Sequence, residues 1–278
     1  MNSQGEQKVK KAILVLIAAV FTAVLAGCGS GESSATSDKK LVLGATIPYS
    51  DMLEKGVKPY LEDKGYTVEV KEFNDYVQPN KSLETGSLDA NLFQHKVYMD
   101  AFAEENNMEL TSVITVPTAP IGIYSNEFKS LDEIKDGSTV ALANDPTNLG
   151  RGLTVLRENG LIEIDENADP LRVTEKDVTS NPKNLKFEPV EAAQLPRTLE
   201  SVDLAAINGN FAISAGIDLA TALALDELPE DIQNRVVVST ENKDEQFVQD
   251  IKEAVESEEF AKVIEEDFKE FHKPEWMK

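Results

Sequence analysis

The chain has 278 residues, of which 41% are hydrophobic and 28% are charged, and its formal net charge at pH 7 is -23. This length accommodates two domains of ordinary size. The acidic balance argues against a nucleic-acid partner, because phosphate contacts need a basic face. It is typical of a solvated, soluble surface.

Residues 1–27 have the pattern of a lipoprotein signal peptide. Lysines within 8–11 precede an apolar run, 12–25, that is too short to span a membrane comfortably. The run ends in 25–28 (LAGC), which resembles the bacterial lipobox, whose cysteine is lipidated and becomes the new N-terminus. Cys28 is the only cysteine, so no internal disulfide is expected.

Lipidation of Cys28 predicts where the protein resides. Acyl chains such as palmitate would anchor it to the extracytoplasmic face of the cell membrane without a transmembrane helix. Residues 28–39 are rich in glycine and serine and lack an apolar period, which predicts a lipidated, flexible tether between the anchor and the folded body.

The first part of the folded body alternates between short strands and helices. Strands are expected at 40–46, 66–73, 88–93 and 110–116. Helices are expected at 51–65, 81–86 and 96–106. This alternation predicts an α/β domain with a mostly parallel sheet.

The second part repeats the alternation with a longer irregular stretch. Strands are expected at 138–143, 186–190, 203–208 and 235–239. Helices are expected at 146–159, 192–200 and 210–216, with one or two amphipathic helices in 247–271. Pro196 makes the second of these helices short or kinked, and two prolines make 165–185 mostly loop.

Two α/β lobes fit this count of elements. We expect 40–124 plus 240–278 to form lobe I and 125–239 to form lobe II, with crossover segments near Tyr124 and Ser239. A cleft between two such lobes is a usual place for a small ligand.

One strand-to-helix turn has the chemistry of an anion site. Asp145-Pro146 follows the strand at 138–143, and proline suits the first helical position. Asn148 and Arg151 are three residues apart and share a face of the helix. A helix N-terminus attracts an anion, and an arginine matches a carboxylate with two hydrogen bonds. The turn therefore predicts a carboxylate-binding corner.

Four segments, one of which contains this turn, indicate a protein family when they are taken together with the lipobox. They occur in this order: 93–98 (FQHKVY), 144–151 (NDPTNLGR), 193–197 (AQLPR) and 206–208 (AIN). The set resembles the NlpA family, the methionine-binding lipoproteins of ABC importers. The resemblance runs from about Lys40 to the C-terminus. It implies a periplasmic-binding-protein-like fold, with two lobes, two crossover segments and the ligand in the cleft. It also implies delivery of L-methionine, or a close relative, to a membrane permease driven by a cytoplasmic ATPase.

The resemblance also implies a set of ligand-binding residues. They are Tyr76, Phe93, His95, Tyr98, Asn148, Arg151 and Asn208. Arg151 would hold the α-carboxylate with Asn148 as a further donor, and Asn208 would accept from the α-ammonium. The three aromatic rings would enclose the thioether, and His95 would bond the sulfur or orient a neighbour. The chain departs from the family at Val97 and Phe211, where proline and tyrosine are common, and at Asn210, where smaller residues are common.

Other functions leave weaker traces in the sequence. It contains no phosphate-binding glycine loop, no Gly-x-Ser-x-Gly and no His/Cys cluster with metal spacing, so we expect no enzyme, no catalytic residues, no metal and no cofactor. The alternatives that stay open are a binding protein for a methionine-containing dipeptide or another small amino acid, and a surface sensor or adhesion lipoprotein on the same fold.

Overall fold

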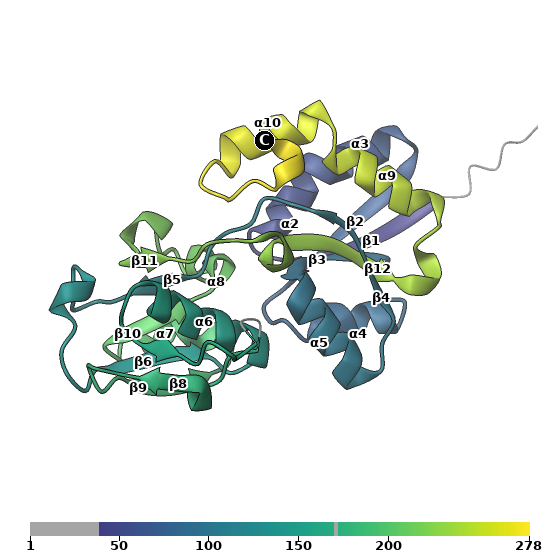
Figure 1. Cartoon of the computed structure of the whole chain (residues 1–278). Coiled ribbons are helices and arrows are strands. Elements are labelled where there is room, and N and C mark those ends of the chain that lie inside the picture. The colour runs from purple at the N-terminus through teal and green to yellow at the C-terminus, as the bar shows by residue number, and fades with distance from the viewer. Residues whose placement is uncertain (1–38, 170–171) are drawn as a thin grey trace, which may run out of the picture. The chain divides into compact units, whose positions relative to one another are not determined.

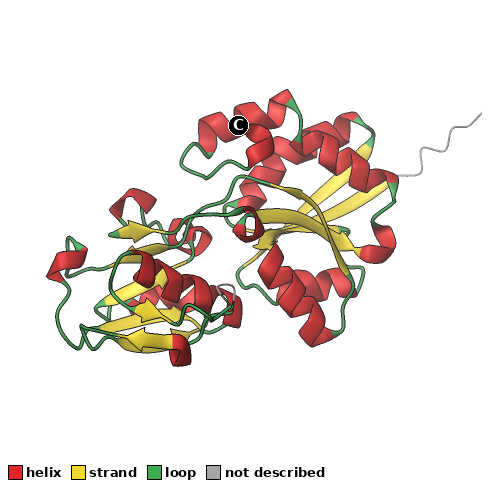
Figure 2. Ribbon diagram, in the orientation of Figure 1, coloured by secondary structure: helices red, strands yellow, loops and turns green. Residues whose placement is uncertain are grey.

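The computed structural model describes residues 39–169 and 172–278. The predicted signal peptide, Cys28 and almost all of the predicted tether lie outside the described residues. Two five-stranded sheets organise the described part, and both belong to one unit of the chain. Figure 2 shows them as two separate sets of yellow strands, each with its own helices.

The first sheet has the strand order β2-β1-β3-β12-β4. Its strands are β1 (Lys39–Thr46), β2 (Tyr66–Phe73), β3 (Ala90–His95), β4 (Leu110–Thr115) and β12 (Asn234–Ser239). Strands β2 and β3 run parallel to β1, whereas β12 is antiparallel to both of its neighbours. The sheet is therefore parallel except for β12.

Helices cover both faces of this sheet. They are α2 (Tyr49–Met52), the π-helix η1 (Leu53–Val57), α3 (Lys58–Asp63), α4 (Gln78–Glu84), α5 (Lys96–Asn106), α9 (Gln246–Val255) and α10 (Glu258–Asp267). Figure 1 shows α3 and α9 on one face and α4 and α5 on the other. This arrangement explains why the strand sequences are apolar. When helices cover both faces of a sheet, the side chains that point to either face are buried. Leu43, Leu92 and Val238 are all fully buried.

The second sheet has the strand order β11-β5-β10-β6-β9. Its strands are β5 (Gly122–Tyr124), β6 (Thr139–Ala143), β9 (Lys186–Val190), β10 (Leu204–Ile207) and β11 (Ala224–Leu225). Its α-helices are α6 (Pro146–Glu158), α7 (Leu195–Thr198) and α8 (Gly209–Ser214). A small separate hairpin pairs β7 (Glu163–Ile164) with β8 (Val178–Ser180). Here β5 is the one strand that runs against the others.

The two sheets share one topology. Each has three parallel strands, then one reversed strand, then a last strand. In each sheet the reversed strand follows a crossover: β5 follows the first crossover, 116–121, and β12 follows the second, 226–233. The prediction of two α/β lobes joined by two crossover segments is confirmed. We call the first sheet with its helices lobe I and the second sheet with its helices lobe II.

The predicted lobe boundaries, 40–124 plus 240–278 and 125–239, assign two strands to the wrong sheet. β5 pairs with β10 and β11 in lobe II, and β12 pairs with β3 and β4 in lobe I. Both crossovers therefore lie before these strands, whereas the predicted boundaries lay after them. The physical reason is that an apolar strand carries no local signal of which sheet it will join.

Candidate functional site

The strand-to-helix turn after β6 forms as the sequence predicts. Asp145 is the N-cap of α6, and its carboxylate accepts from the backbone N–H of Asn148 at 3.0 Å and the hydroxyl of Thr147 at 2.9 Å. Pro146 occupies the first helical position, where no backbone N–H is needed. The cap fixes the start of α6, and with it the positions of Asn148 and Arg151.

Within this corner, both polar atoms of the Asn148 amide bond to protein partners. Its Nδ2 donates to both carboxylate oxygens of Asp145 at 3.1 Å. Its Oδ1 accepts from Arg151 Nη1 at 3.2 Å and from Asn208 Nδ2 at 2.9 Å. Asn148 therefore orients two neighbours, Arg151 and Asn208, through its oxygen, while the Asp145 carboxylate holds its Nδ2.

Arg151 forms a buried ion pair with Asp226, at the end of the second lobe's edge strand. Arg151 Nη2 and Nε donate to Asp226 Oδ2 at 2.6 and 3.2 Å, and the two side chains are only 10% and 5% exposed. Burial raises the pKa of Asp226 above its ordinary value, and the Arg151 guanidinium opposes that rise. The pair holds one edge of the guanidinium and leaves Nη1 turned toward Asn148.

Asp226 is the residue of this site that sequence reasoning missed. Its Oδ1 also accepts from the backbone N–H of Ile121 at 2.7 Å, and its own N–H donates to the Ile121 carbonyl at 2.9 Å. Asp226 thus joins the second crossover to the first and to Arg151. No signal in the sequence singles out this residue, because it is one of 50 acidic residues and stands in no motif.

Asn208 ends β10 and stands at the N-cap of α8. Its Nδ2 is used by Asn148, but its Oδ1 is buried without a hydrogen-bond partner among the described residues. A buried acceptor without a partner costs free energy unless a donor reaches it. A bound ligand with a hydrogen-bond donor could supply the missing partner of this oxygen.

Aromatic rings of lobe I form a cluster beside this polar corner. Tyr76, Phe93 and Tyr98 lie with ring centroids 5.7 to 5.9 Å apart. The Tyr98 hydroxyl donates to the Tyr76 carbonyl at 3.0 Å, which fixes the loop before α4 against α5. Phe211 of α8 joins from lobe II, with its ring 4.8 Å from that of Tyr76. The cluster makes a wall suited to an apolar chain.

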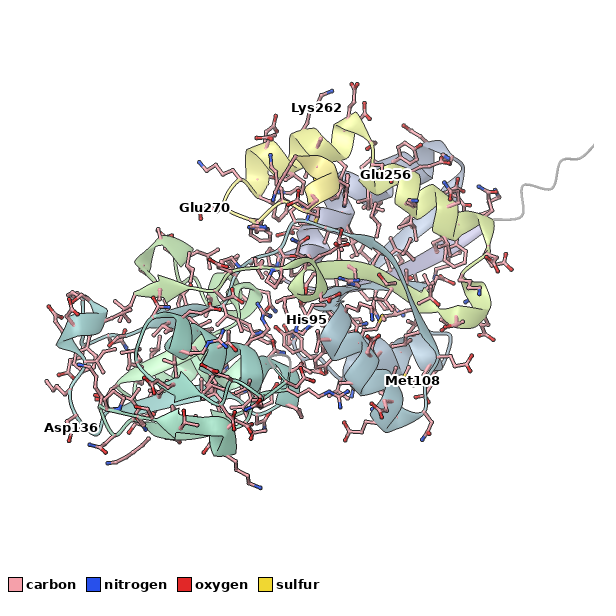
Figure 3. All side chains as sticks on the ribbon, in the orientation of Figure 1. His95, Met108, Asp136, Glu256, Lys262 and Glu270 are labelled. Carbon is pink, nitrogen blue, oxygen red and sulfur yellow. The ribbon has the colours of Figure 1, made fainter. Side chains whose placement is uncertain are left out.

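His95 lies where β3 ends and α5 begins, and Figure 3 labels it. Its Nδ1 accepts from the backbone N–H of Tyr98 at 3.1 Å, so the ring caps α5. Burial lowers the pKa of His95 well below its ordinary value, and the Arg151 charge lowers it further. Asn148 lies close enough to oppose this slightly, yet Nε2 has no partner of hydrogen-bond geometry among the described residues. The ring is therefore neutral, with its proton on Nε2.

The lowered pKa of His95 predicts how stability depends on pH. Above about pH 6.5 the ring is neutral in both folded and unfolded chains, so it contributes no pH dependence. Below that, the unfolded chain takes up a proton that the folded chain cannot, and stability falls by up to about 1.4 kcal/mol per pH unit. In His95→Asn, whose side-chain oxygen retains the cap, we expect a smaller loss between pH 7 and 5 by urea denaturation. Identical losses in variant and wild type would contradict the buried neutral ring.

All seven residues proposed from sequence line one small cavity, which offers about 20 Å³ to the centres of water molecules. The sequence did not propose its other lining residues, which are Tyr49, Gln94, Thr118, Ala119, Ile121, Gly209, Asn210 and Asn234. Three of these, Thr118, Ala119 and Ile121, come from the first crossover. With His95 neutral, Arg151 supplies the only charge among the described residues that line this cavity.

The described residues form neither a metal-binding group nor a membrane-spanning helix. Within 39–169 and 172–278, no group of three or more His, Cys, Asp or Glu side chains is arranged to hold a metal ion. In the same ranges no helix has the length and apolar character needed to cross a membrane.

Comparisons with known proteins agree on one family. A family model described as NlpA lipoprotein matches residues 41–276. The D-methionine-binding lipoprotein MetQ of Salmonella typhi is 39% identical over 246 residues, 87% of this chain and 89% of its own. The methionine-binding lipoprotein MetQ of Bacillus subtilis is 38% identical over 208 residues, 73% and 76% of the two chains. The structure of a nutrient binding protein from Burkholderia cenocepacia bound to methionine has a TM-score of 0.78 and 37% identity, over 82% of this chain and 97% of that one. These relatives are named for binding and not for catalysis.

Proposed function

Because the chain belongs to the NlpA lipoprotein family, we propose that its cavity between the lobes binds L-methionine, or a close relative such as the D-isomer, for an ABC importer. The observation that carries this proposal is the composition of the cavity. It combines one arginine, a buried acceptor without a partner and an aromatic cluster. These three features match the carboxylate, the ammonium and the apolar side chain of such an amino acid.

The carboxylate would bind at the Arg151 end of the cavity. Nη1 of Arg151 donates to Asn148 and not to Asp226. Since Nη1 carries two hydrogens, it can also donate one to a ligand. The Nε2–H of His95, near the same corner, offers a second donor that has no partner among the residues the structure describes. A hydrogen bond from a charged donor is about twice as strong as a neutral one, which makes Arg151 the principal contact.

The ammonium would bind Asn208 Oδ1, which is buried and without a partner among the described residues. Because Asp226 already balances Arg151, this buried ion pair carries no net charge of its own. A zwitterion, whose own charges sum to zero, can enter without leaving a net charge buried. A ligand with a net charge would place an unbalanced charge in the buried site.

The thioether chain would lie against Tyr76, Phe93 and Tyr98. Sulfur is polarizable, and its contacts with aromatic rings contribute about 0.3–1.5 kcal/mol each. The corner alone suits any small amino acid, so the discrimination between side chains rests on this wall.

The test is calorimetric titration of the purified protein with L-methionine, D-methionine, the other amino acids and methionine-containing dipeptides. We expect binding of methionine and a higher melting temperature. At free ligand 100 times the Kd, linkage adds about 2.7 kcal/mol to the free energy of unfolding. If only a dipeptide or another amino acid gives heat, that compound and not methionine is the ligand. If none of them gives heat or a melting shift, the proposal is overturned.

We further propose that Cys28 carries the lipid anchor and that the cell-surface protein delivers its ligand to a permease with a cytoplasmic ATPase. The family supports the lipoprotein part, and the lipobox-like 25–28 locates it. Mass spectrometry of the N-terminal peptide should find an acylated Cys28; an unmodified cysteine at the mature N-terminus contradicts the anchor. Loss of labelled-methionine uptake in cells lacking the protein would support delivery, and unchanged uptake would argue against it.

A further inference from the structure

One side chain of lobe II forms hydrogen bonds to lobe I through both the oxygen and the nitrogen of its amide. Asn210, the second residue of α8, accepts from the Tyr76 hydroxyl at Oδ1 over 2.6 Å. Its Nδ2 donates to the hydroxyl of Thr46, the last residue of β1, over 3.3 Å. Tyr76 and Thr46 both belong to lobe I, so Asn210 spans the cavity that it helps to line. We call Asn210, Tyr76 and Thr46 the interlobe clasp.

Two of the three clasp residues, Asn210 and Thr46, are buried, and Tyr76 is half-buried. Asn210 is buried, and the Phe211 ring beside it covers the Tyr76 ring at 4.8 Å. Burial raises the pKa of Tyr76 far above its ordinary value, so its hydroxyl stays a donor at neutral pH. Hydrogen bonds screened from water are stronger than exposed ones, and leaving either partner unpaired is costly.

The start of α8 is held in place by the first crossover. A Cβ at Gly209 would lie 2.5 Å from the Pro120 carbonyl oxygen and 2.6 Å from the Ala119 Cβ, closer than atoms can approach. Only glycine lets α8 approach the crossover this closely. Asn208 and Asn210 flank this fixed point: Asn208 Oδ1 is without a partner, whereas Asn210 is fully bonded to lobe I.

We propose that Asn210 is a positioning residue that holds the two lobes together across the cavity, and so slows ligand release without recognising the ligand itself. The inference rests on the proposed function for the ligand, but its bonds join protein to protein. They form only when the lobes meet, so they raise the population of the closed state. A ligand held in that state gains affinity in proportion to that population, whatever its side chain.

The first test measures ligand release. In Asn210→Ala we expect the dissociation rate of L-methionine, followed by stopped-flow fluorescence, to rise about tenfold, as the loss of roughly 1.4 kcal/mol predicts. The ratio of the Kd values for L-methionine and L-norleucine should stay as in wild type. Ser214→Ala, at the exposed end of the same helix, is the matched control and should release at the wild-type rate. An unchanged rate in Asn210→Ala, or a changed ratio, overturns the proposal.

The second test separates this inference from the proposed function, because it uses the ligand-free full-length protein. Hydrogen exchange should speed up in α8 and in the loop around Tyr76 in both Asn210→Ala and Tyr76→Phe, which removes only the hydroxyl. The double variant should exchange no faster than the faster single variant, since one bond is shared. Wild-type exchange in both single variants, or additive effects in the double variant, contradicts the clasp even if methionine binds. If no amino acid binds while exchange changes as expected, the clasp stands and the ligand proposal fails.

Discussion

Replacing Arg151 with alanine is expected to weaken L-methionine binding by roughly a hundredfold, about 3 kcal/mol, in calorimetric titration. Among the described residues that line the cavity, the variant loses the one charged group, and it leaves the ligand's carboxylate buried without a cation. Arg151→Lys should also bind weakly, because an ammonium cannot hold Asp226 along one edge and offer a second nitrogen to the ligand.

Arg157, two turns along α6, provides the control for this result. It is partly exposed, and it forms an ion pair with the neighbouring Glu158. Arg157→Ala should therefore bind methionine as the wild type does. A normal Kd for Arg151→Ala would remove Arg151 from the site, and an equally weak Arg157→Ala would indicate a general effect of charge on α6.

Replacing Asp226 with alanine is expected to lower the free energy of unfolding by about 3 kcal/mol, measured by urea denaturation. The variant leaves the buried Arg151 without its counter-ion and the Ile121 N–H without its acceptor. Glu227→Ala, at the exposed next position of the crossover, should change stability by less than about 0.5 kcal/mol. A loss no larger than that of Glu227→Ala would contradict the buried pair.

The pair also allows stability and binding to be separated. A buried ion pair replaced by apolar residues of similar volume is often neutral or stabilising. Arg151→Met with Asp226→Leu should therefore recover much of the stability that Asp226→Ala loses, yet bind methionine as poorly as Arg151→Ala. Recovery of binding in the double variant would show that the guanidinium is dispensable.

The sequence contained enough to predict the site wherever its chemistry is local. Asp145 and Pro146 specify a helix start, and that start places Asn148 and Arg151 on one face. The other five predicted residues came from resemblance, and the fold brings all seven to one cavity. What pattern alone could not give is the partner of each polar group. Asn148 offers a free amide in the sequence, whereas in the structure its two polar atoms bond to Asp145, Arg151 and Asn208.

The misassigned strands and the missed Asp226 have one physical cause. Which sheet β5 and β12 join, and which arginine Asp226 meets, depend on contacts between residues far apart in the chain. Asp226 and Arg151 are 75 positions apart, and no local pattern encodes such a pairing. Helix starts and short helices such as α7, which contains Pro196, are set by neighbouring residues and were predictable.

A crystal structure of the protein grown with L-methionine tests the central claim most directly, since the sulfur's anomalous signal locates the ligand. We expect its carboxylate within hydrogen-bond distance of Arg151 Nη1, its ammonium on Asn208 Oδ1, and its sulfur among the rings of Tyr76, Phe93 and Tyr98. Methionine bound outside this cavity, or bound in it with the ammonium turned toward Arg151, would contradict the account.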